Sequence, residues 1–156
     1  MEKTFYFDSA PQPYRAETAI VWCFDDRITL AVQKFLKRRN FLHVDSIRVA
    51  GGPKALASPG NEAEHQFLLD QIRLSRKLHG IERVILVLHS DCGAYGGIES
   101  FAGDVGAERE HHCAELARAA ASLRAAVPDL EVEGFFVDFS GVSRVEIQLA
   151  RSSGAD

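Results

Sequence analysis

The sequence lacks the features that mark several specialised classes of protein. Its 18 Lys and Arg are outnumbered by 22 Asp and Glu, for a formal net charge of -4, so we expect no nucleic-acid partner. No apolar run approaches the ~18 residues that span a bilayer. The clearest apolar strand candidate, residues 84–88, ends at His89, and we expect no membrane partner. Residues 1–15 contain no apolar run of signal-peptide length, which makes the cytoplasm the expected compartment.

Cysteine is also scarce, with Cys23, Cys92 and Cys113 alone in the sequence. An odd, small number in a reducing compartment points away from structural disulfides and towards free thiols or thiolate chemistry. The remaining composition is ordinary, because 46% hydrophobic and 26% charged residues are close to the average of globular proteins. The length of 156 residues predicts a single domain over 1–156, of which 1–17 form an N-terminal extension.

Short apolar segments alternate with longer segments of helical periodicity. The predicted strands are residues 18–22, 43–49, 83–88, 131–139 and 144–149. The predicted helices are residues 28–39, 61–79 and about 107–127. Alternating strands and helices indicate right-handed crossovers in a mostly parallel sheet. Ser140-Gly141 predicts that the last two strands form an antiparallel hairpin. The fold class is therefore α/β, a central sheet flanked by helices.

Two cysteines and one histidine follow strands of this predicted sheet. Cys23 directly follows the strand 18–22, and both His89 and Cys92 follow the strand 83–88. Open α/β sheets bind ligands beyond the carboxyl ends of their strands. If the first and third strands are neighbours, the three side chains converge at one edge of the sheet. Two thiolates and one imidazole form a ligand set that suits Zn²⁺.

Three protein ligands leave one tetrahedral position open, as in catalytic zinc sites. Water bound there falls from a pKa of about 15.7 towards about 7, which gives hydroxide at neutral pH. Asp25 and Arg27 follow Cys23 at two-residue steps, so their side chains could reach the same cavity. An ion pair with Arg27 would keep the Asp25 carboxylate ionised and aimed at the water. Asp91, between His89 and Cys92, could join this site or cap the following turn.

These residues resemble the paired signature of the β-class carbonic anhydrases. The sequence Cys-Phe-Asp-Asp-Arg at 23–27 is similar to that family's Cys-x-Asp-x-Arg motif, and His-Ser-Asp-Cys-Gly at 89–93 to its His-x-x-Cys-Gly motif. Arg-Val-Ala-Gly-Gly at 48–52 resembles a further family segment, with Val49 where Asn is usual. The hairpin at 133–141 extends the resemblance over about residues 19–149. The family's N-terminal helices, which wrap a partner subunit, are largely absent.

The resemblance implies a fold, an activity and a set of residue roles. The implied sheet has four parallel strands in the order 2-1-3-4, numbered along the chain, and a C-terminal antiparallel strand. The implied enzyme is a zinc lyase that hydrates CO₂ reversibly to bicarbonate through a zinc-bound hydroxide. One Zn²⁺ per chain would be held by Cys23, His89 and Cys92, with Asp25 and Arg27 as the catalytic dyad. In some members the aspartate occupies the fourth zinc position, and Asp25 could do the same. A homodimer or dimer of dimers, with a pocket shared between subunits, is also implied.

Two other functions use the same residues. Zinc hydrolases of carbon disulfide and carbonyl sulfide share these ligand motifs, and a protein with this fold could hold zinc without turnover.

Several further residues carry weaker signals. His111, His112 and Cys113 are adjacent, and adjacent helical positions do not face one another, so we expect a polar first turn and one buried thiol there rather than a second metal site. His43, His65, His111 or His112 could relay protons from the site. Tyr95 could line the cavity or pack at the base of the glycine-rich loop 93–106.

Overall fold

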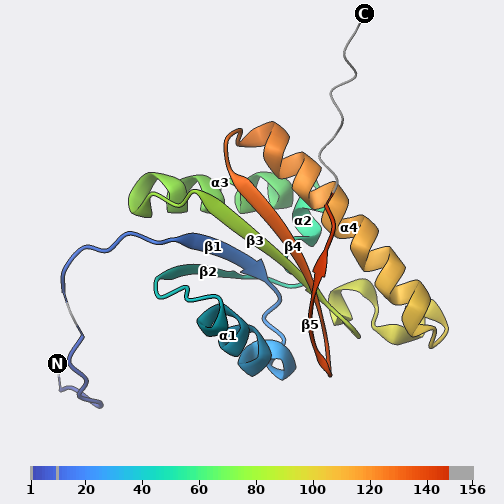
Figure 1. Ribbon diagram of the computed structural model, residues 1–156, viewed down its shortest axis with the longest axis horizontal. Coiled ribbons are helices and arrows are strands. Elements are labelled where there is room, and N and C mark those ends of the chain that lie inside the picture. Colours follow the sequence, from blue (N-terminus) through green and yellow to red (C-terminus); the bar gives the residue numbers. More distant parts are fainter. Residues whose placement is uncertain (1, 10, 148–156) are drawn as a thin grey trace, which may run out of the picture.

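A five-stranded sheet forms the centre of the protein, and helices lie on both of its faces (Figure 1). The computed structural model describes residues 2–9 and 11–147. The strands are β1 (Thr18–Trp22), β2 (Val44–Arg48), β3 (Arg83–His89), β4 (Glu131–Asp138) and β5 (Gly141–Val145). Their order is β2-β1-β3-β4-β5, with β1 to β4 parallel and β5 antiparallel to β4. The fold class and strand order expected from the sequence are confirmed.

The helices are α1 (Thr29–Arg38), α2 (Lys54–Ala57), α3 (Glu62–His79) and α4 (Val105–Ala126), with 3₁₀ turns at Asp26–Ile28, Gly93–Tyr95 and Ile98–Phe101. The short helix α2 was not predicted, and α4 begins two residues earlier than expected. Asp104 causes this earlier start, because its carboxylate accepts hydrogen bonds from the N–H groups of Gly106 and Ala107.

The last strand differs from its prediction. β5 begins at Gly141, three residues before the expected start, and the expected end at Leu149 lies outside the described residues. The shift has a local cause in the turn. Asp138 Oδ1 accepts the N–H groups of Ser140 and Gly141 at 2.8 and 2.9 Å, so the turn needs only Phe139 and Ser140. The predicted antiparallel hairpin is present.

The expected ends of α3 are confirmed. Asn61 Oδ1 accepts the N–H of Glu64 at 3.0 Å, and Glu64 Oε2 accepts the N–H of Gly60 at 3.0 Å, so the first turn is capped from both directions. Gly80 ends the helix with a φ of 73°, a left-handed conformation that glycine adopts without steric cost.

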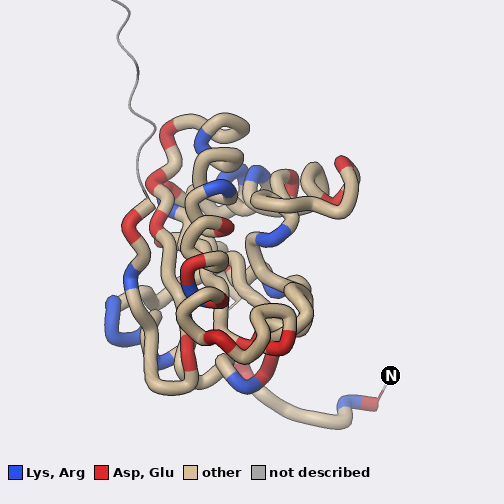
Figure 2. The backbone as a smooth tube through the Cα atoms, turned by 90° about the vertical axis from the view of Figure 1, so that its right-hand side faces the viewer, with Lys and Arg blue, Asp and Glu red and all other residues tan. Residues whose placement is uncertain are grey.

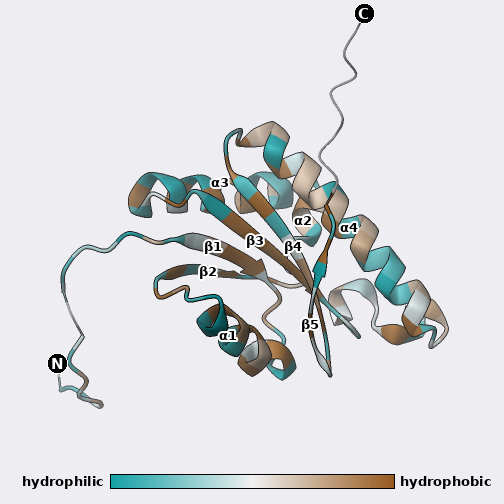
Figure 3. Ribbon diagram, in the orientation of Figure 1, coloured by the Kyte–Doolittle hydropathy of each residue, from teal (hydrophilic) through white to brown (hydrophobic). Residues whose placement is uncertain are grey.

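Each face of the sheet has its own hydrophobic core. On one face Val21 and Leu86 pack with residues of α2, α3 and α4, such as Leu68. On the other face Ile20 and Ile85 pack against α1. Both sets of neighbouring strand residues are therefore buried, which is why β1 and β3 are almost continuously hydrophobic (Figure 3).

The surface carries both signs of charge. Lys and Arg positions are interspersed with Asp and Glu positions along the chain (Figure 2). Within residues 2–9 and 11–147, no helix is long and apolar enough to cross a membrane.

Candidate metal centre

The carboxyl ends of β1 and β3 bring two thiols and one imidazole together. Cys23, His89 and Cys92 each offer one ligand atom, and these atoms all lie within 4.8 Å of one another. The three side chains are buried. They meet because β1 and β3 are direct neighbours, so Cys23, just after β1, lies beside His89 at the end of β3. In the described part of the chain, this is the one group of three such side chains close enough to hold an ion.

The imidazole of His89 is oriented as a metal ligand would be. Its Nδ1 lies 2.8 Å from the carbonyl oxygen of Ser90. A carbonyl only accepts, so Nδ1 carries the proton and donates it, and Nε2 keeps its lone pair in the neutral ring. Nε2 is buried and has no hydrogen-bond partner among the described residues. A buried lone pair without a partner is unfavourable, and a cation between the two thiols would satisfy it.

The two thiols of this group differ in acidity. A hydrogen bond from Cys92 is the main cause that lowers the pKa of the Cys23 thiol, although burial opposes the shift. The bond to Cys23 and burial raise the pKa of Cys92. A metal ion bound by the two sulfurs would stabilise both as thiolates.

Asp25 and Arg27 lie beside this group and contact each other. Arg27 Nη2 donates to Asp25 Oδ2 at 2.6 Å, and Arg27 Nε donates to Oδ1 at 3.0 Å. The Asp25 carboxylate also accepts the backbone N–H of Arg27 at 3.0 Å and so caps the 3₁₀ turn that follows. The Arg27 side chain is the main cause that lowers the pKa of Asp25 to about 2. The carboxylate is therefore ionised at neutral pH.

Asp91 takes both of the roles that the sequence left open. Its Oδ2 accepts from Arg27 Nη1 at 2.8 Å, and its carbonyl oxygen accepts from Nη2 at 3.0 Å. Its Oδ1 accepts the N–H of Ile98 at 3.0 Å and so closes the following turn. Arg27 thus joins the segment after β1 to the segment after β3.

The loop after β2 packs closely against β1 and β3, near their carboxyl ends. Gly52 has a φ of 55°, and a Cβ built on it would lie 2.8 Å from the carbonyl oxygen of Val87 and 3.1 Å from the backbone of Trp22. Only glycine fits this approach without displacing a strand. This close packing accounts for the glycine at position 52.

Comparison with known proteins assigns the chain to a family. A family model described as "Putative carbonic anhydrase" matches residues 14–147. The chain belongs to this carbonic anhydrase family. A relative of known sequence, an uncharacterized protein of Rickettsia bellii (strain RML369-C), is 26% identical over 130 residues, covering 81% of this chain and 79% of that protein.

Solved structures show the same fold. The carbonic anhydrase of Streptococcus mutans matches with a TM-score of 0.58 and 21% identity, covering 89% of this chain and 88% of that chain. The β-carbonic anhydrase isoform I of Trichomonas vaginalis matches with a TM-score of 0.58 and 15% identity over 92% and 90%. A carbon disulfide hydrolase matches with a TM-score of 0.56 and 13% identity over 92% and 85%. The β-class resemblance seen in the sequence is confirmed.

The histidines of this carbonic anhydrase family member lie differently from expectation. His112 of α4 is fully buried, whereas Cys113 is half-buried, so the expectation of a polar turn with one buried thiol is wrong. The helix turns His112 towards Phe136 of the sheet. Burial, together with the neighbouring His111 and His89, lowers the pKa of His112 to about 4, which keeps this ring neutral at pH 7.

Two of the suggested proton relays lie far from the metal centre. His43 directly precedes β2. Because β2 is parallel to β1, His43 lies at the amino ends of these strands, opposite the carboxyl ends where the candidate metal centre lies. His65 Nε2 contacts Ser122 Oγ at 2.8 Å, near the C-terminal end of α4. Neither ring can exchange a proton directly with the site.

Tyr95 packs at the base of its loop. Its hydroxyl donates to Glu115 Oε2 at 2.8 Å, and its ring packs edge-on against His112 at a centroid distance of 4.7 Å.

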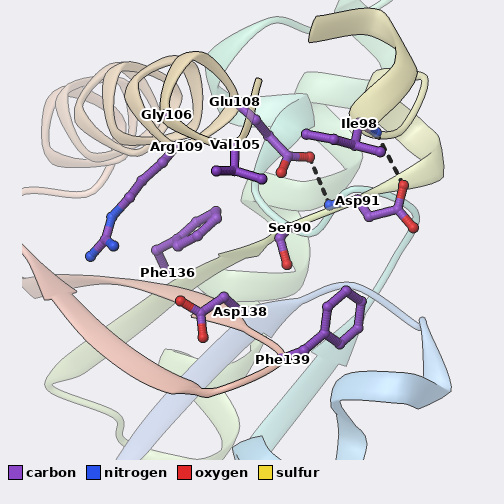
Figure 4. Close-up of a pocket in the computed structure, with 10 residues that line it drawn as sticks. All are labelled: Ser90, Asp91, Ile98, Val105, Gly106, Glu108, Arg109, Phe136, Asp138 and Phe139. Carbon is purple, nitrogen blue, oxygen red and sulfur yellow. Dashed lines mark hydrogen bonds between the residues drawn. The ribbon is translucent and has the colours of Figure 1, made fainter. Parts of the chain in front are cut away.

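A cavity of about 600 Å³ lies beside the segment that connects His89 to Cys92 (Figure 4). Its walls include Ile98, Val105, Phe136 and Phe139. The buried carboxylate of Glu108 also lines it. Glu108 was not predicted as a site residue, because several buried positions of α4 carry polar residues and hide its buried face in the sequence.

Proposed function

We propose that this protein binds one Zn²⁺ per chain through Cys23, His89 and Cys92 and catalyses the reversible hydration of CO₂ to bicarbonate. The observation that carries the proposal is the buried thiol–thiol–imidazole group, in which His89 Nε2 has no other partner. Membership of the carbonic anhydrase family supports the class of reaction. Two sulfurs and one imidazole nitrogen favour Zn²⁺ over harder cations.

Zinc held by Cys23, His89 and Cys92 could activate a water molecule. Zn²⁺ held by these three residues would supply a Lewis acid that lowers the pKa of water towards about 7. The carbonyl oxygen of Ser90 fixes the tautomer and ring orientation of His89. Burial of all three ligands excludes competing water from the sulfurs.

Asp25 and Arg27 orient the attacking water in this proposal. Asp25 Oδ2 accepts one full hydrogen bond from Arg27 Nη2 and shares the Nε–H with Oδ1, so Oδ2 is the oxygen with capacity left to accept a hydrogen bond from the water. The water oxygen then attacks the carbon of CO₂, and the released proton leaves to buffer. Arg27 does not transfer a proton; it keeps the Asp25 carboxylate ionised and fixed.

Hydrolysis of carbon disulfide or carbonyl sulfide is the second candidate. It is favoured by the fold similarity to a carbon disulfide hydrolase. This reaction releases sulfide, which CO₂ hydration does not. A sulfide assay with each of the two substrates separates the two activities.

The direct test combines zinc analysis and stopped-flow CO₂ hydration on one preparation of each variant. We expect the wild type to hold one zinc per chain and to hydrate CO₂, and Cys23→Ser to lose both properties. Cys113→Ser is the matched control, because Cys113 lies on α4 outside the group, and it should keep both. A wild type without bound metal would overturn the zinc proposal. A zinc-loaded wild type without CO₂ hydration would overturn the activity and leave the sulfide-releasing or non-catalytic functions.

The implied homodimer, or dimer of dimers, is also part of the proposal. Phe24, Val105 and Phe139 are 62%, 72% and 67% exposed. Phe24 adjoins the metal centre in the sequence, and Val105 and Phe139 line the cavity beside it. Large apolar side chains gathered around a site favour a protein partner there, and a second copy of this chain is the partner we propose.

A further inference from the structure

Glu108, in the first turn of α4, is a buried carboxylate with an unusual environment. It is 1% exposed, and among the described residues no Lys or Arg side chain forms an ion pair with it. Its nearest titratable partner, His112, lies 3.8 Å away and is kept neutral by burial. Burying a carboxyl group is unfavourable unless hydrogen bonds replace its hydration. A carboxyl group that is buried without a cationic partner needs a hydrogen-bond donor within the protein.

That donor is the backbone N–H of Asp91, which hydrogen-bonds to Glu108 Oε1 at 2.7 Å (Figure 4). Asp91 has a φ of 53°, a left-handed conformation that residues other than glycine rarely adopt. The surrounding bonds must therefore hold it in place. Glu108 supplies the bond on the α4 side, and Ile98 supplies a second bond at Asp91 Oδ1.

The left-handed conformation of Asp91 determines which hydrogen-bond acceptors face Arg27. It allows both the side chain and the carbonyl oxygen of Asp91 to accept from the same guanidinium, at 2.8 and 3.0 Å. With its Nη1 and Nη2 held in this way, Arg27 keeps its Nε and the remaining bond of Nη2 for Asp25. Hydrogen bonds therefore connect Glu108 of α4 to Asp91, Asp91 to Arg27, and Arg27 to the carboxylate of Asp25.

We infer that Glu108 is a positioning residue for the Asp25–Arg27 pair and acts through the backbone of Asp91. Its effect on CO₂ hydration rests on the proposed function, whereas its effect on Arg27 does not. Among the described residues, Glu108 forms its hydrogen bond with Asp91 and its ion-pair contact with His112, and none with a proposed metal ligand or with Asp25. Its role is to hold Asp91 in the conformation that presents two acceptors to Arg27.

Three substitutions separate this role from simple burial of a carboxylate. Glu108→Gln keeps an oxygen at the same reach and should preserve the bond to Asp91. Glu108→Asp keeps the carboxyl group but shortens the side chain by one methylene, so it should lose the bond. Glu108→Ala removes the acceptor altogether. Glu133→Ala is the matched control, because Glu133 is a buried carboxylate paired with Arg39 on another part of the sheet.

The decisive readout is the side-chain Nε–H signal of Arg27 in ¹⁵N NMR spectra, assigned by its disappearance in Arg27→Lys. This proton points at the Asp25 carboxylate in the structure, so it should exchange slowly with water. We expect the wild-type signal in Glu108→Gln and Glu133→Ala, and a broadened or shifted signal in Glu108→Asp and Glu108→Ala. If Glu108→Ala does not fold, the contrast between the Asp and Gln variants decides. An unchanged Arg27 signal in Glu108→Asp would overturn the inference, whatever the activity of the protein.

The kinetic consequence is measured on the same variants. With zinc content equal to that of the wild type, the turnover number kcat for CO₂ hydration should fall about tenfold or more in Glu108→Asp, with little change in KM, because misplacing a catalytic group costs rate. Glu108→Gln should restore it. If the wild type does not hydrate CO₂, the NMR result still tests the positioning role, so the failure of one claim is distinguishable from the failure of the other.

Discussion

At the residue scale, Arg27 connects two carboxylates that come from different strands of the sheet. Asp25 follows β1 and Asp91 follows β3, and both accept hydrogen bonds from the same guanidinium. A planar group with five donors can hold two acceptors in fixed directions, which a single ammonium cannot do. The orientation of Asp25 therefore depends on the shape of the arginine side chain as well as on its charge.

We expect Arg27→Lys to bind zinc normally and to lose CO₂ hydration by on the order of 10²-fold in kcat/KM, because the charge remains but the orientation is lost. Stopped-flow kinetics with zinc analysis of the same sample measure both quantities. Glu133→Ala, which removes a different buried ion pair, serves as the control and should retain kcat/KM. Wild-type kinetics in Arg27→Lys would show that Asp25 needs no bidentate partner.

The side chains of the candidate metal centre were predictable because each lies at the end of a strongly apolar strand or just after it. Cys23, His89 and Cys92 inherit their positions from β1 and β3, whose burial on both faces makes them easy to recognise. The bond from Arg27 to Asp91 was not predictable, since it depends on the left-handed φ of Asp91. The burial of Glu108 depends on how α4 packs, and polar residues at several of its buried positions hide that face in the sequence.

At the scale of elements, Asp45 of β2 joins the edge of the sheet to α3 and to the segment before β1. Its carboxylate accepts hydrogen bonds from Ser75 Oγ at 2.5 Å, His79 Nδ1 at 2.8 Å and Tyr14 Oη at 3.1 Å. Burial alone would raise the pKa of Asp45, but the bonds from Ser75, His79 and Tyr14 outweigh it and lower the pKa. The ionised form of Asp45 is thus more stable in the folded chain than in the unfolded one.

This lowered pKa predicts a pH-dependent contribution to stability. Asp45 stabilises the fold above its unfolded pKa of ~3.9, and the contribution disappears as pH falls through the lower folded value. We expect Asp45→Asn to reduce the free energy of unfolding by about 1–2 kcal/mol at pH 7, and the difference from the wild type to shrink below pH ~4. Urea unfolding at several pH values measures this. Asp70→Asn, which removes an exposed carboxylate on α3, should show little effect, and a pH-independent loss in Asp45→Asn would contradict the account.

The loop after β2 gives a second prediction at this scale. Gly52→Ala places a Cβ 2.8 Å from the carbonyl oxygen of Val87 at a φ of 55°, so it should destabilise the protein by about 1–3 kcal/mol and reduce zinc occupancy. Gly141→Ala is the control, because nothing lies within 4 Å of its added Cβ. Thermal unfolding and zinc analysis measure the two effects. Equal stability of the two variants would mean that the close approach is not required.

Most elements were predictable where local chemistry and packing agree. Asn61, Glu64 and Gly80 are signals that act within a few residues, and they mark the ends of α3 as expected. The start of β5 was misplaced because the turn is closed by Asp138, a side chain within the preceding strand. The four residues of α2 show no periodicity, and their helix depends on contacts with α4 and α3.

At the scale of the whole molecule, the proposed assembly makes the exposed apolar residues near the site part of an interface. We expect the mass in solution to be two or four times the 17.2 kDa of one chain, measured by light scattering after size-exclusion chromatography. Val105→Asp should weaken this assembly, since Val105 is 72% exposed beside the site. Leu42 is 80% exposed and lies just before β2, at the amino ends of the parallel strands and away from the site. Leu42→Asp should therefore leave the assembly intact. A wild type that is monomeric at all concentrations would contradict the proposed dimer.

The proposed CO₂ hydration depends on a zinc ion held by the candidate metal centre at the ends of β1 and β3. X-ray absorption spectroscopy at the zinc edge of the purified protein tests it most directly. The account predicts one zinc per chain, with two sulfur neighbours at about 2.3 Å and nitrogen or oxygen neighbours at about 2.0–2.1 Å, and the loss of one sulfur neighbour or of the zinc itself in Cys92→Ser. Zinc surrounded only by nitrogen and oxygen, or a spectrum unchanged in Cys92→Ser, would contradict it.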